Sequence, residues 1–230
     1  MNSLTKKVKA DHLDDVEIPE TAQTTVWKGD FGRQYSDRNT FDPEALDELY
    51  RRNFGLTRRE INETFLSDVP KDASFLEVGC NTGNQLLSLQ QMGYSNLSGV
   101  ELQPYAIEIA RSRVPSTPLK LGSALALPYA DAAFDLVFTS GVLIHIAPHD
   151  LPRAMDEIYR CSREYIWGME YYASETTEVS YRSHTGLLWK MDFPRRYLER
   201  FRDLELLQEK KLPYLDNGNV DIIFLLRKKR

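Results

Sequence analysis

The sequence is poor in the residues that build disulfide frameworks and metal centres. It contains two cysteines, Cys80 and Cys161, and four histidines among 230 residues. Two cysteines cannot form a framework of disulfides, and the absence of a CxxC spacing argues against zinc. We therefore expect a chain that works in a reducing compartment and holds no metal ion.

Long hydrophobic runs and excess positive charge are also missing. No apolar stretch is long enough to span a bilayer, and the polar residues 1–20 lack the apolar core of a signal peptide. The net charge is −5, whereas proteins that bind nucleic acids usually present a basic surface to the phosphates. These features predict a cytoplasmic protein whose main partner is neither a membrane nor a nucleic acid.

Hydrophobic periodicity divides the chain into three parts. Residues 1–25 are charged and poor in large apolar side chains, so we expect a mobile tail. Residues 26–70 combine a short aromatic segment with a helical pattern that Gly55 divides in two, and we interpret them as a helical lid. Residues 71–230 alternate short apolar runs with helical stretches, which is typical of a parallel sheet covered by helices.

The end of the chain departs from this alternation. The predicted strands Leu204–Leu212 and Asp221–Leu226 follow one another, joined by a loop with Asn217 and Gly218, and this favours an antiparallel hairpin. The earlier predicted strands are 74–78, 97–100, 119–121, 134–139 and 164–170. The sequence therefore predicts an α/β fold, with a Rossmann-like, mostly parallel, seven-stranded sheet, helices on both faces and a C-terminal antiparallel hairpin.

The turn after the first predicted strand carries the clearest functional signal. Glu77 lies at the end of this strand, and Gly79 and Gly83 lie in the turn to the next helix. Glycine lets a backbone approach a ligand closely, and the start of a helix offers free N–H groups that suit a carboxylate. Asn81 replaces the middle glycine of the dinucleotide fingerprint, and no Walker sequence follows. The turn thus favours a ligand with a carboxylate and an adenosine over a pyrophosphate, with a ligand-free turn as the alternative.

A second acid supports an adenosine ligand. Glu101 ends the next predicted strand, about 20 residues after the glycine turn, where a carboxylate can accept hydrogen bonds from both ribose hydroxyls. A solvated acid at the end of a strand is the alternative.

The glycine turn with Glu77, and Glu101 after it, resemble motif I and the motif that follows it in the class I S-adenosylmethionine-dependent methyltransferases. The resemblance implies S-adenosyl-L-methionine as cofactor, and Ser123 stands where this family often has an aspartate near the adenine. A segment like 27–39 folds over the cofactor in such enzymes, although packing of its aromatic residues against the domain is an equal alternative. The cofactor contacts that the resemblance implies are Glu77, Gly79, Cys80, Asn81, Gly83, Glu101, Leu102, Ser123, Ala124, Leu125, Thr139, Tyr35 and Arg38.

The resemblance also suggests residues for the acceptor and the chemistry. His145 follows the fourth predicted strand and would lie near the transferred methyl, where its ordinary pKa near neutrality suits a general base. Glu170 and Tyr171 end the fifth predicted strand, and Arg182 lies in the following loop, so we expect all three to bind substrate. The alternatives are a structural histidine, a structural hydrogen bond for Glu170 and a plain surface loop around Arg182.

A narrower resemblance concerns the acceptor. The chain looks like the methylases associated with pseudaminic acid biosynthesis in five segments, residues 27–39, 76–81, 141–146, 157–162 and 170–172. This implies methyl transfer to an oxygen or nitrogen of a small polar molecule, such as an amino sugar or a nonulosonic acid precursor. A methyltransferase acting on peptide side chains and a non-catalytic cofactor-binding protein are the alternatives, and a dehydrogenase is the least favoured.

Overall fold

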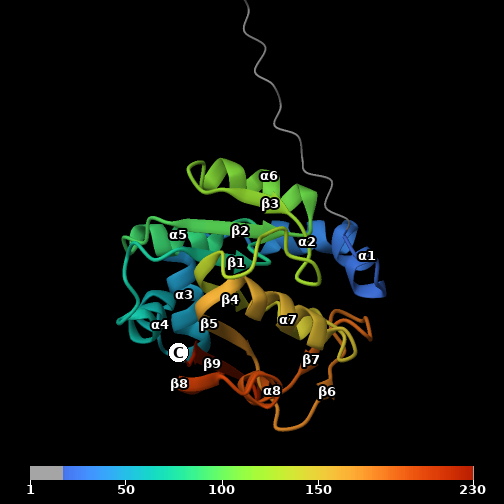
Figure 1. Cartoon of the computed structure of the whole chain (residues 1–230). Coiled ribbons are helices and arrows are strands. Elements are labelled where there is room, and N and C mark those ends of the chain that lie inside the picture. Colours follow the sequence, from blue (N-terminus) through green and yellow to red (C-terminus); the bar gives the residue numbers. More distant parts are fainter. Residues whose placement is uncertain (1–17, 230) are drawn as a thin grey trace, which may run out of the picture.

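The computed structural model describes residues 18–229 (Figure 1). Of the predicted tail, residues 1–17 lie outside the described residues. The predicted tail boundary at residue 25 is wrong, because helix α1 (Ala22–Lys28) begins three residues earlier. Thr21 and Thr24 form a capping box at the start of this helix, and the Thr24 side chain is buried.

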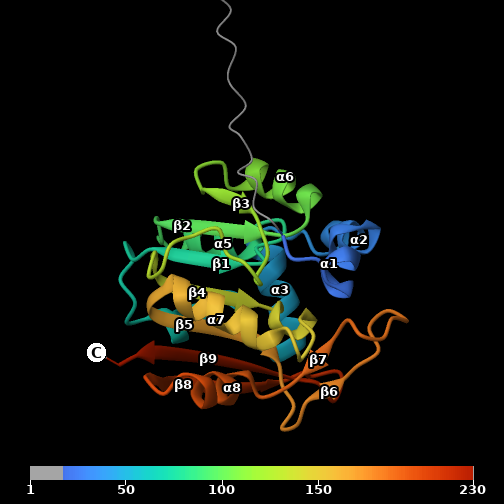
Figure 2. The ribbon, with the colours of Figure 1, turned by 45° about the vertical axis from the view of Figure 1, so that its right-hand side comes forward.

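A seven-stranded sheet forms the centre of the molecule, in the order β3-β2-β1-β4-β5-β9-β8 (Figures 1 and 2). Strands β1 to β5 are parallel, β9 runs antiparallel to β5, and β8 runs antiparallel to β9. This arrangement confirms the predicted fold class, including the C-terminal antiparallel pair. The strand bounds are Phe75–Val78 (β1), Leu97–Glu101 (β2), Leu119–Leu121 (β3), Phe134–Ser140 (β4), Ser162–Tyr171 (β5), Leu204–Pro213 (β8) and Val220–Lys228 (β9).

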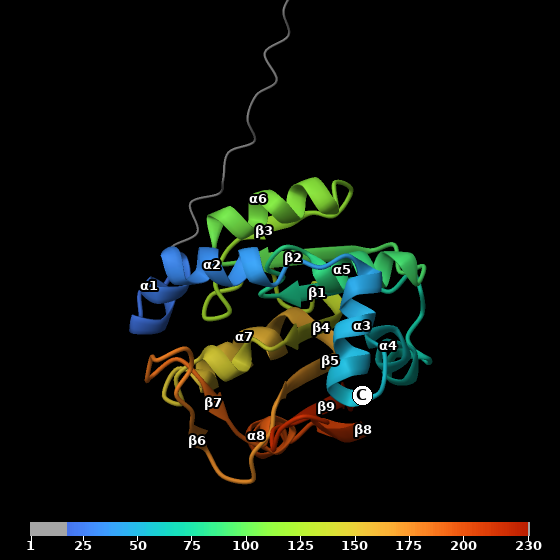
Figure 3. The same cartoon turned by 180° about the vertical axis from the view of Figure 1, so that it is seen from behind.

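Helices cover both faces of the sheet, which Figures 1 and 3 show from opposite sides. Successive side chains of a strand point to opposite faces, so Phe75 and Leu136 join a core with α4 and α5, whereas Leu76 and Val137 join a core with α7 and α8. The bounds of these helices are Arg58–Leu66 (α4), Asn84–Gln91 (α5), Leu151–Cys161 (α7) and Phe193–Arg200 (α8), and α6 (Pro104–Arg113) contacts β2 and β3.

The N-terminal segment contains more regular structure than its aromatic pattern predicts. Helix α1 is followed at Gly29 by α2 (Asp30–Arg38), and α3 (Pro43–Phe54) comes next. Gly55 ends α3 in the left-handed conformation, at φ +74°, so the predicted division of the helical pattern is confirmed. We call residues 21–41 the N-terminal strap.

Three short elements were not predicted from the sequence. Strands β6 (Thr177–Glu178) and β7 (Trp189–Lys190) form a separate antiparallel pair within the segment between β5 and α8. A turn of 3-10 helix, η1 (Leu143–His145), follows β4. Within residues 18–229, no helix is both long and apolar enough to cross a membrane.

The register of the central strands brings separate parts of the chain to one edge. Glu77 of β1 is paired with Gly99 of β2 and with Phe138 of β4. The carboxyl ends of β1, β2 and β4 therefore meet, and in open α/β sheets this edge is where ligands bind.

Candidate active site

A cavity of about 270 Å³ opens at the carboxyl edge of the sheet. The ends of β1, β2 and β4 form its floor, and the N-terminal strap lies across it, at the end toward which β1 and β2 point (Figure 2). Eleven of the residues expected from the sequence line it: Glu77, Gly79, Cys80, Asn81, Glu101, Leu102, Ser123, Ala124, Leu125, Tyr35 and His145. Most of the residues predicted from the sequence to bind cofactor therefore lie together at this cavity, and the remaining predicted residues do not line it.

The glycine turn lies directly against the cavity. Gly79 has a φ of +74°, and a Cβ atom there would lie 2.6 Å from a Val142 methyl carbon, so only glycine fits without displacing its neighbours. Gly83 also has a positive φ, but a Cβ atom there would contact Val114 and Ala110 and not a ligand. Gly83 does not line the cavity, so the structure does not support its expected contact with the cofactor. Its role is to let the start of α5 pack closely against Val114 and Ala110.

Two backbone N–H groups fix the carboxylate of Glu101. The amide of Asn81 donates to one oxygen and the amide of Gln103 donates to the other, each at 2.7 Å. Burial raises the pKa of Glu101, and these two hydrogen bonds oppose that change. A carboxylate can accept about four hydrogen bonds, so this one is oriented to accept further hydrogen bonds from a ligand.

The carboxyl group of Glu77, unlike that of Glu101, is not held by hydrogen bonds to both of its oxygens. Its side chain is buried, and its Oε2 atom has no hydrogen-bond partner among the described residues. Burial raises the pKa of Glu77 well above its usual value, while the positive charge of Arg58 lowers it. An unpartnered buried oxygen is rare and costly, so a cationic donor in the cavity, such as an ammonium group, would stabilise it.

The loop after β3 supplies a wall suited to a flat ring. Leu102 and the residues 122–125 line the cavity, and the Ser123 hydroxyl accepts a hydrogen bond from the Leu125 amide at 3.1 Å. Because that bond uses a lone pair of the oxygen, the hydroxyl hydrogen remains available for a ring nitrogen.

The N-terminal strap is fastened to the glycine turn and to the start of α6. The side-chain amide of Gln103 donates to the carbonyls of Trp27, Lys28 and Gly29, at 3.1, 2.8 and 3.0 Å. The Ser36 hydroxyl of α2 lies 2.7 Å from Asn81 Oδ1. The strap is thus held over the cavity by contacts at the junction of α1 and α2 and within α2.

We expect a Gly32→Ala substitution to loosen this strap. A Cβ atom at Gly32 would lie 1.9 Å from the Trp27 carbonyl oxygen, so α1 and α2 must separate. The expected result is a loss of affinity for S-adenosylhomocysteine of about tenfold, or about 1.4 kcal/mol, measured by calorimetry. Gly218→Ala is the matched control, since a Cβ atom there contacts nothing within 4 Å. Equal affinities in the two variants would contradict the role of the strap.

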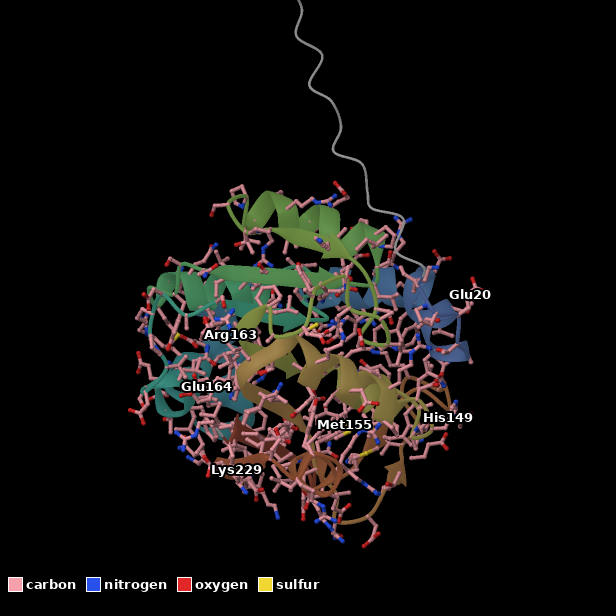
Figure 4. All side chains as sticks on the ribbon, in the orientation of Figure 1. Glu20, His149, Met155, Arg163, Glu164 and Lys229 are labelled. Atoms are coloured by element: carbon pink, nitrogen blue, oxygen red, sulfur yellow. The ribbon has the colours of Figure 1, made fainter. Side chains whose placement is uncertain are left out.

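His145 is held in a defined orientation at the cavity. Its Nδ1 atom lies 2.7 Å from the Leu187 carbonyl oxygen, and the Trp27 ring lies 4.5 Å from the imidazole. Since a carbonyl can only accept, Nδ1 carries the proton and Nε2 is left as an acceptor. Burial lowers the pKa of His145 to about 4, so the ring is neutral near pH 7 but is a weaker base than the expected pKa near neutrality would make it. By contrast, the side chain of His149 is 78% exposed (Figure 4).

Two other predicted cofactor residues lie away from the cavity. Arg38 is exposed in the last turn of α2, on the side opposite Ser36, which faces the glycine turn. Thr139 is buried and its hydroxyl donates to Glu170. The structure therefore does not support a cofactor contact for Arg38 or Thr139.

The three predicted substrate residues are also not brought to the cavity. The Glu170 carboxylate accepts from the amides of Val142 and Ile144, at 3.2 and 3.3 Å, and burial raises its pKa to about 7. Tyr171 packs against the Tyr214 ring, with ring centres 6.0 Å apart. Arg182 is exposed in a tight turn, at φ +50°. Glu170 thus supports the turn that carries His145, and the alternative of a structural hydrogen bond is the better account of it.

Tyr50 and Gln103 also line the cavity, and the sequence did not point to either of them. Trp27, Ser36 and Asn39 belong to the segment 27–39 that was expected to fold over the cofactor, and Ser140 follows Thr139 at the end of β4. Gln103 had a recognisable signal, because it directly precedes Pro104 and caps α6 through the Tyr105 amide. Tyr50 comes from α3, and no local pattern marks it.

Comparison with known proteins agrees with this geometry. Residues 76–164 match the methyltransferase domain family. The sheet order and the coverage of both faces are those of Rossmann-like methyltransferases. The sheet continues beyond the matched segment, through β5, β8 and β9.

Two relatives and two structures illustrate the similarity. Methyltransferase GfsG of Streptomyces halstedii is 29% identical over 128 residues, covering 53% of this chain and 44% of its own. O-methyltransferase rstn1 of Aspergillus nomiae is 31% identical over 128 residues, covering 53% and 55%. The chain thus spans about half the length of these curated relatives.

The structural matches extend over more of the chain. The 1,6-didemethyltoxoflavin-N1-methyltransferase of Burkholderia thailandensis, solved with 1,6-didemethyltoxoflavin and S-adenosylhomocysteine, has a TM-score of 0.68 at 17% identity and covers 94% of both chains. The PH0226 protein of Pyrococcus horikoshii has a TM-score of 0.62 at 16% identity, covering 85% of this chain and 95% of its own. At these identities the similarity establishes the fold.

Proposed function

We propose that this protein is an S-adenosylmethionine-dependent methyltransferase that acts on an oxygen or nitrogen of a small polar molecule. The observation that carries the proposal is a pair of carboxylates at the ends of β1 and β2. Glu101 is held by two backbone amides, and Glu77 has an unpartnered oxygen in the same cavity. An acceptor of ribose hydroxyls beside an acceptor of an ammonium group suits the two ends of the cofactor.

The residues present fit this cofactor. Leu102, Ser123, Ala124 and Leu125 would hold the adenine, Glu101 the ribose, and Glu77 with the glycine turn the amino-acid part. When bound, the cofactor supplies a methyl group on a sulfonium, which is a good leaving group. The protein then has to align the acceptor and exclude water, and the strap is placed to do both.

His145 is the proposed general base. Its Nε2 atom is free to take a proton from an acceptor hydroxyl or ammonium group, while the Leu187 carbonyl keeps the ring in place. Trp27, Tyr35 and Tyr50 line the same cavity and would enclose a small ring. An amino sugar or a nonulosonic acid precursor is the proposed acceptor class, on the resemblance described above, and the free cysteines Cys80 and Cys161 support a cytoplasmic location.

A methyl-transfer assay over amino sugars, nucleotide sugars and a peptide panel tests this function, with mass spectrometry as the readout. We expect one of the sugar classes to gain a methyl group in the presence of S-adenosylmethionine. Transfer to peptides and to none of the sugars would indicate that the acceptor is a peptide side chain and not a small molecule. Cofactor binding without transfer to any acceptor, supported by a cofactor that stays intact over hours, would favour a non-catalytic binding protein.

A further inference from the structure

A guanidinium group is buried behind the cavity. Arg58, the first residue of α4, is 0% exposed. The four hydrogen bonds that it makes within the described residues all go to uncharged atoms: Asn62 Oδ1, Tyr50 Oη, Ser140 Oγ and Met169 Sδ, at 2.9, 3.0, 3.2 and 3.0 Å. Its Nη2 atom has no partner there. The charge of Arg58 opposes the rise that burial causes in the pKa values of Glu77 and Asp221, but neither carboxyl group is among its hydrogen-bond partners, so the guanidinium can still stabilise a further anion in the cavity.

Arg58 controls the direction of two hydroxyl groups. Its Nη1 atom donates to the oxygens of Tyr50 and Ser140, and each of these bonds uses a lone pair of the hydroxyl oxygen. The hydroxyl hydrogens are therefore left to be donated elsewhere. Tyr50 of α3 and Ser140 of β4 both line the cavity, so its wall carries two O–H donors backed by a positive charge.

The two hydroxyl donors lie next to a hydrogen-bond acceptor, the carboxyl group of Glu77. Glu77, with its unpartnered oxygen, is paired with Phe138, two residues before Ser140 on the neighbouring strand. One part of the cavity wall thus accepts a hydrogen bond through a carboxyl group, and the adjoining part donates through two hydroxyls. This pairing is complementary to an ammonium and a carboxylate on one carbon, which is the amino-acid end of S-adenosylmethionine.

We propose that Arg58 is a positioning residue for the carboxylate of the cofactor and acts through the hydroxyls of Tyr50 and Ser140. This inference rests on the proposed function. Arg38, the arginine that the resemblance placed at the cofactor, is exposed on α2, whereas Arg58 lies behind the cavity and acts through the two hydroxyls.

Calorimetry with two ligands tests the inference. S-adenosylhomocysteine has the carboxylate, whereas its decarboxylated analogue keeps the amine and the adenosine and lacks only that group. We expect Arg58→Met to weaken binding of S-adenosylhomocysteine by about 10- to 100-fold, the range for hydrogen bonds to a charged group, and to leave the analogue's affinity within about threefold. Arg59→Met is the matched control on the same helix, because the side chain of Arg59 is 50% exposed and pairs with Glu63.

A double variant distinguishes the proposed role of Arg58 from a loss of folding in Arg58→Met. Tyr50→Phe combined with Ser140→Ala keeps the guanidinium and removes both hydroxyls, and it should show the same preference for the decarboxylated analogue. In the Arg58→Met background the two changes should add little, because the residues act as one unit. Equal losses for both ligands, or none, would overturn the inference while leaving the proposed function intact. If the unaltered protein binds neither ligand, both fail.

Discussion

The Glu101→Ala variant is expected to bind S-adenosylmethionine about 100-fold more weakly than the unaltered protein. The carboxylate is fixed by the amides of Asn81 and Gln103 and would accept from both ribose hydroxyls. Hydrogen bonds to a charged group contribute about 1.5–3 kcal/mol each, so losing two of them costs about 3 kcal/mol or more. Calorimetry measures the loss directly, and a thermal melt shows whether the variant still folds.

Glu108→Ala is the matched control for this prediction. Glu108 lies on α6, seven residues after Glu101, and its side chain is 67% exposed and paired with Arg111. Removing the exposed Glu108 carboxylate takes away a negative charge but no residue that lines the cavity, so the affinity should stay within about twofold. A Glu101→Ala variant that binds as tightly as this control would mean that the cofactor's ribose lies elsewhere.

Replacing His145 by alanine should slow methyl transfer by about 100- to 10,000-fold, the usual contribution of a general base. The affinity for S-adenosylhomocysteine should change by less than about threefold, because the proposed role is in the chemical step. His149→Ala, four residues further along the chain, is exposed and should retain the full rate. An unchanged rate for His145→Ala would remove the base from the mechanism.

The pH dependence gives a second check on His145. Burial lowers its pKa to about 4, so the ring is already neutral and able to accept a proton at pH 6. The rate should therefore not fall between pH 8 and 6 through protonation of this group, and should decline as the pH approaches 4. A fall in the rate centred near pH 6.5, absent in His145→Ala, would indicate that His145 titrates as an exposed histidine and would contradict this prediction.

The sequence predicted the parts of the molecule in which local pattern and position agree. Short apolar runs marked the strands, and parallel strands carry their carboxyl ends to one edge, so Glu77 and Glu101 were expected to meet there. Gly79 was recognisable from its position in the turn between a strand and a helix, and its backbone conformation explains why a glycine stands there. These inferences depend only on strand direction and on backbone geometry.

The errors arose where a side chain's direction or a distant partner decides the outcome. Glu170 ends a strand at the correct edge, yet its oxygens are taken by the amides of Val142 and Ile144. Arg38 lies two residues beyond Ser36 on α2, and this separation turns it to the opposite side of the helix. Gln103 and Arg58 act through contacts that span tens of residues, which no short pattern records.

Titration of the unaltered protein with S-adenosylmethionine, S-adenosylhomocysteine and NAD, followed by calorimetry, is the most direct test of the cavity's ligand. The carboxylates of Glu77 and Glu101 and the Asn81 turn predict micromolar binding of the first two compounds and no detectable binding of NAD. Tight binding of NAD, with no heat from either methionine derivative, would contradict this account.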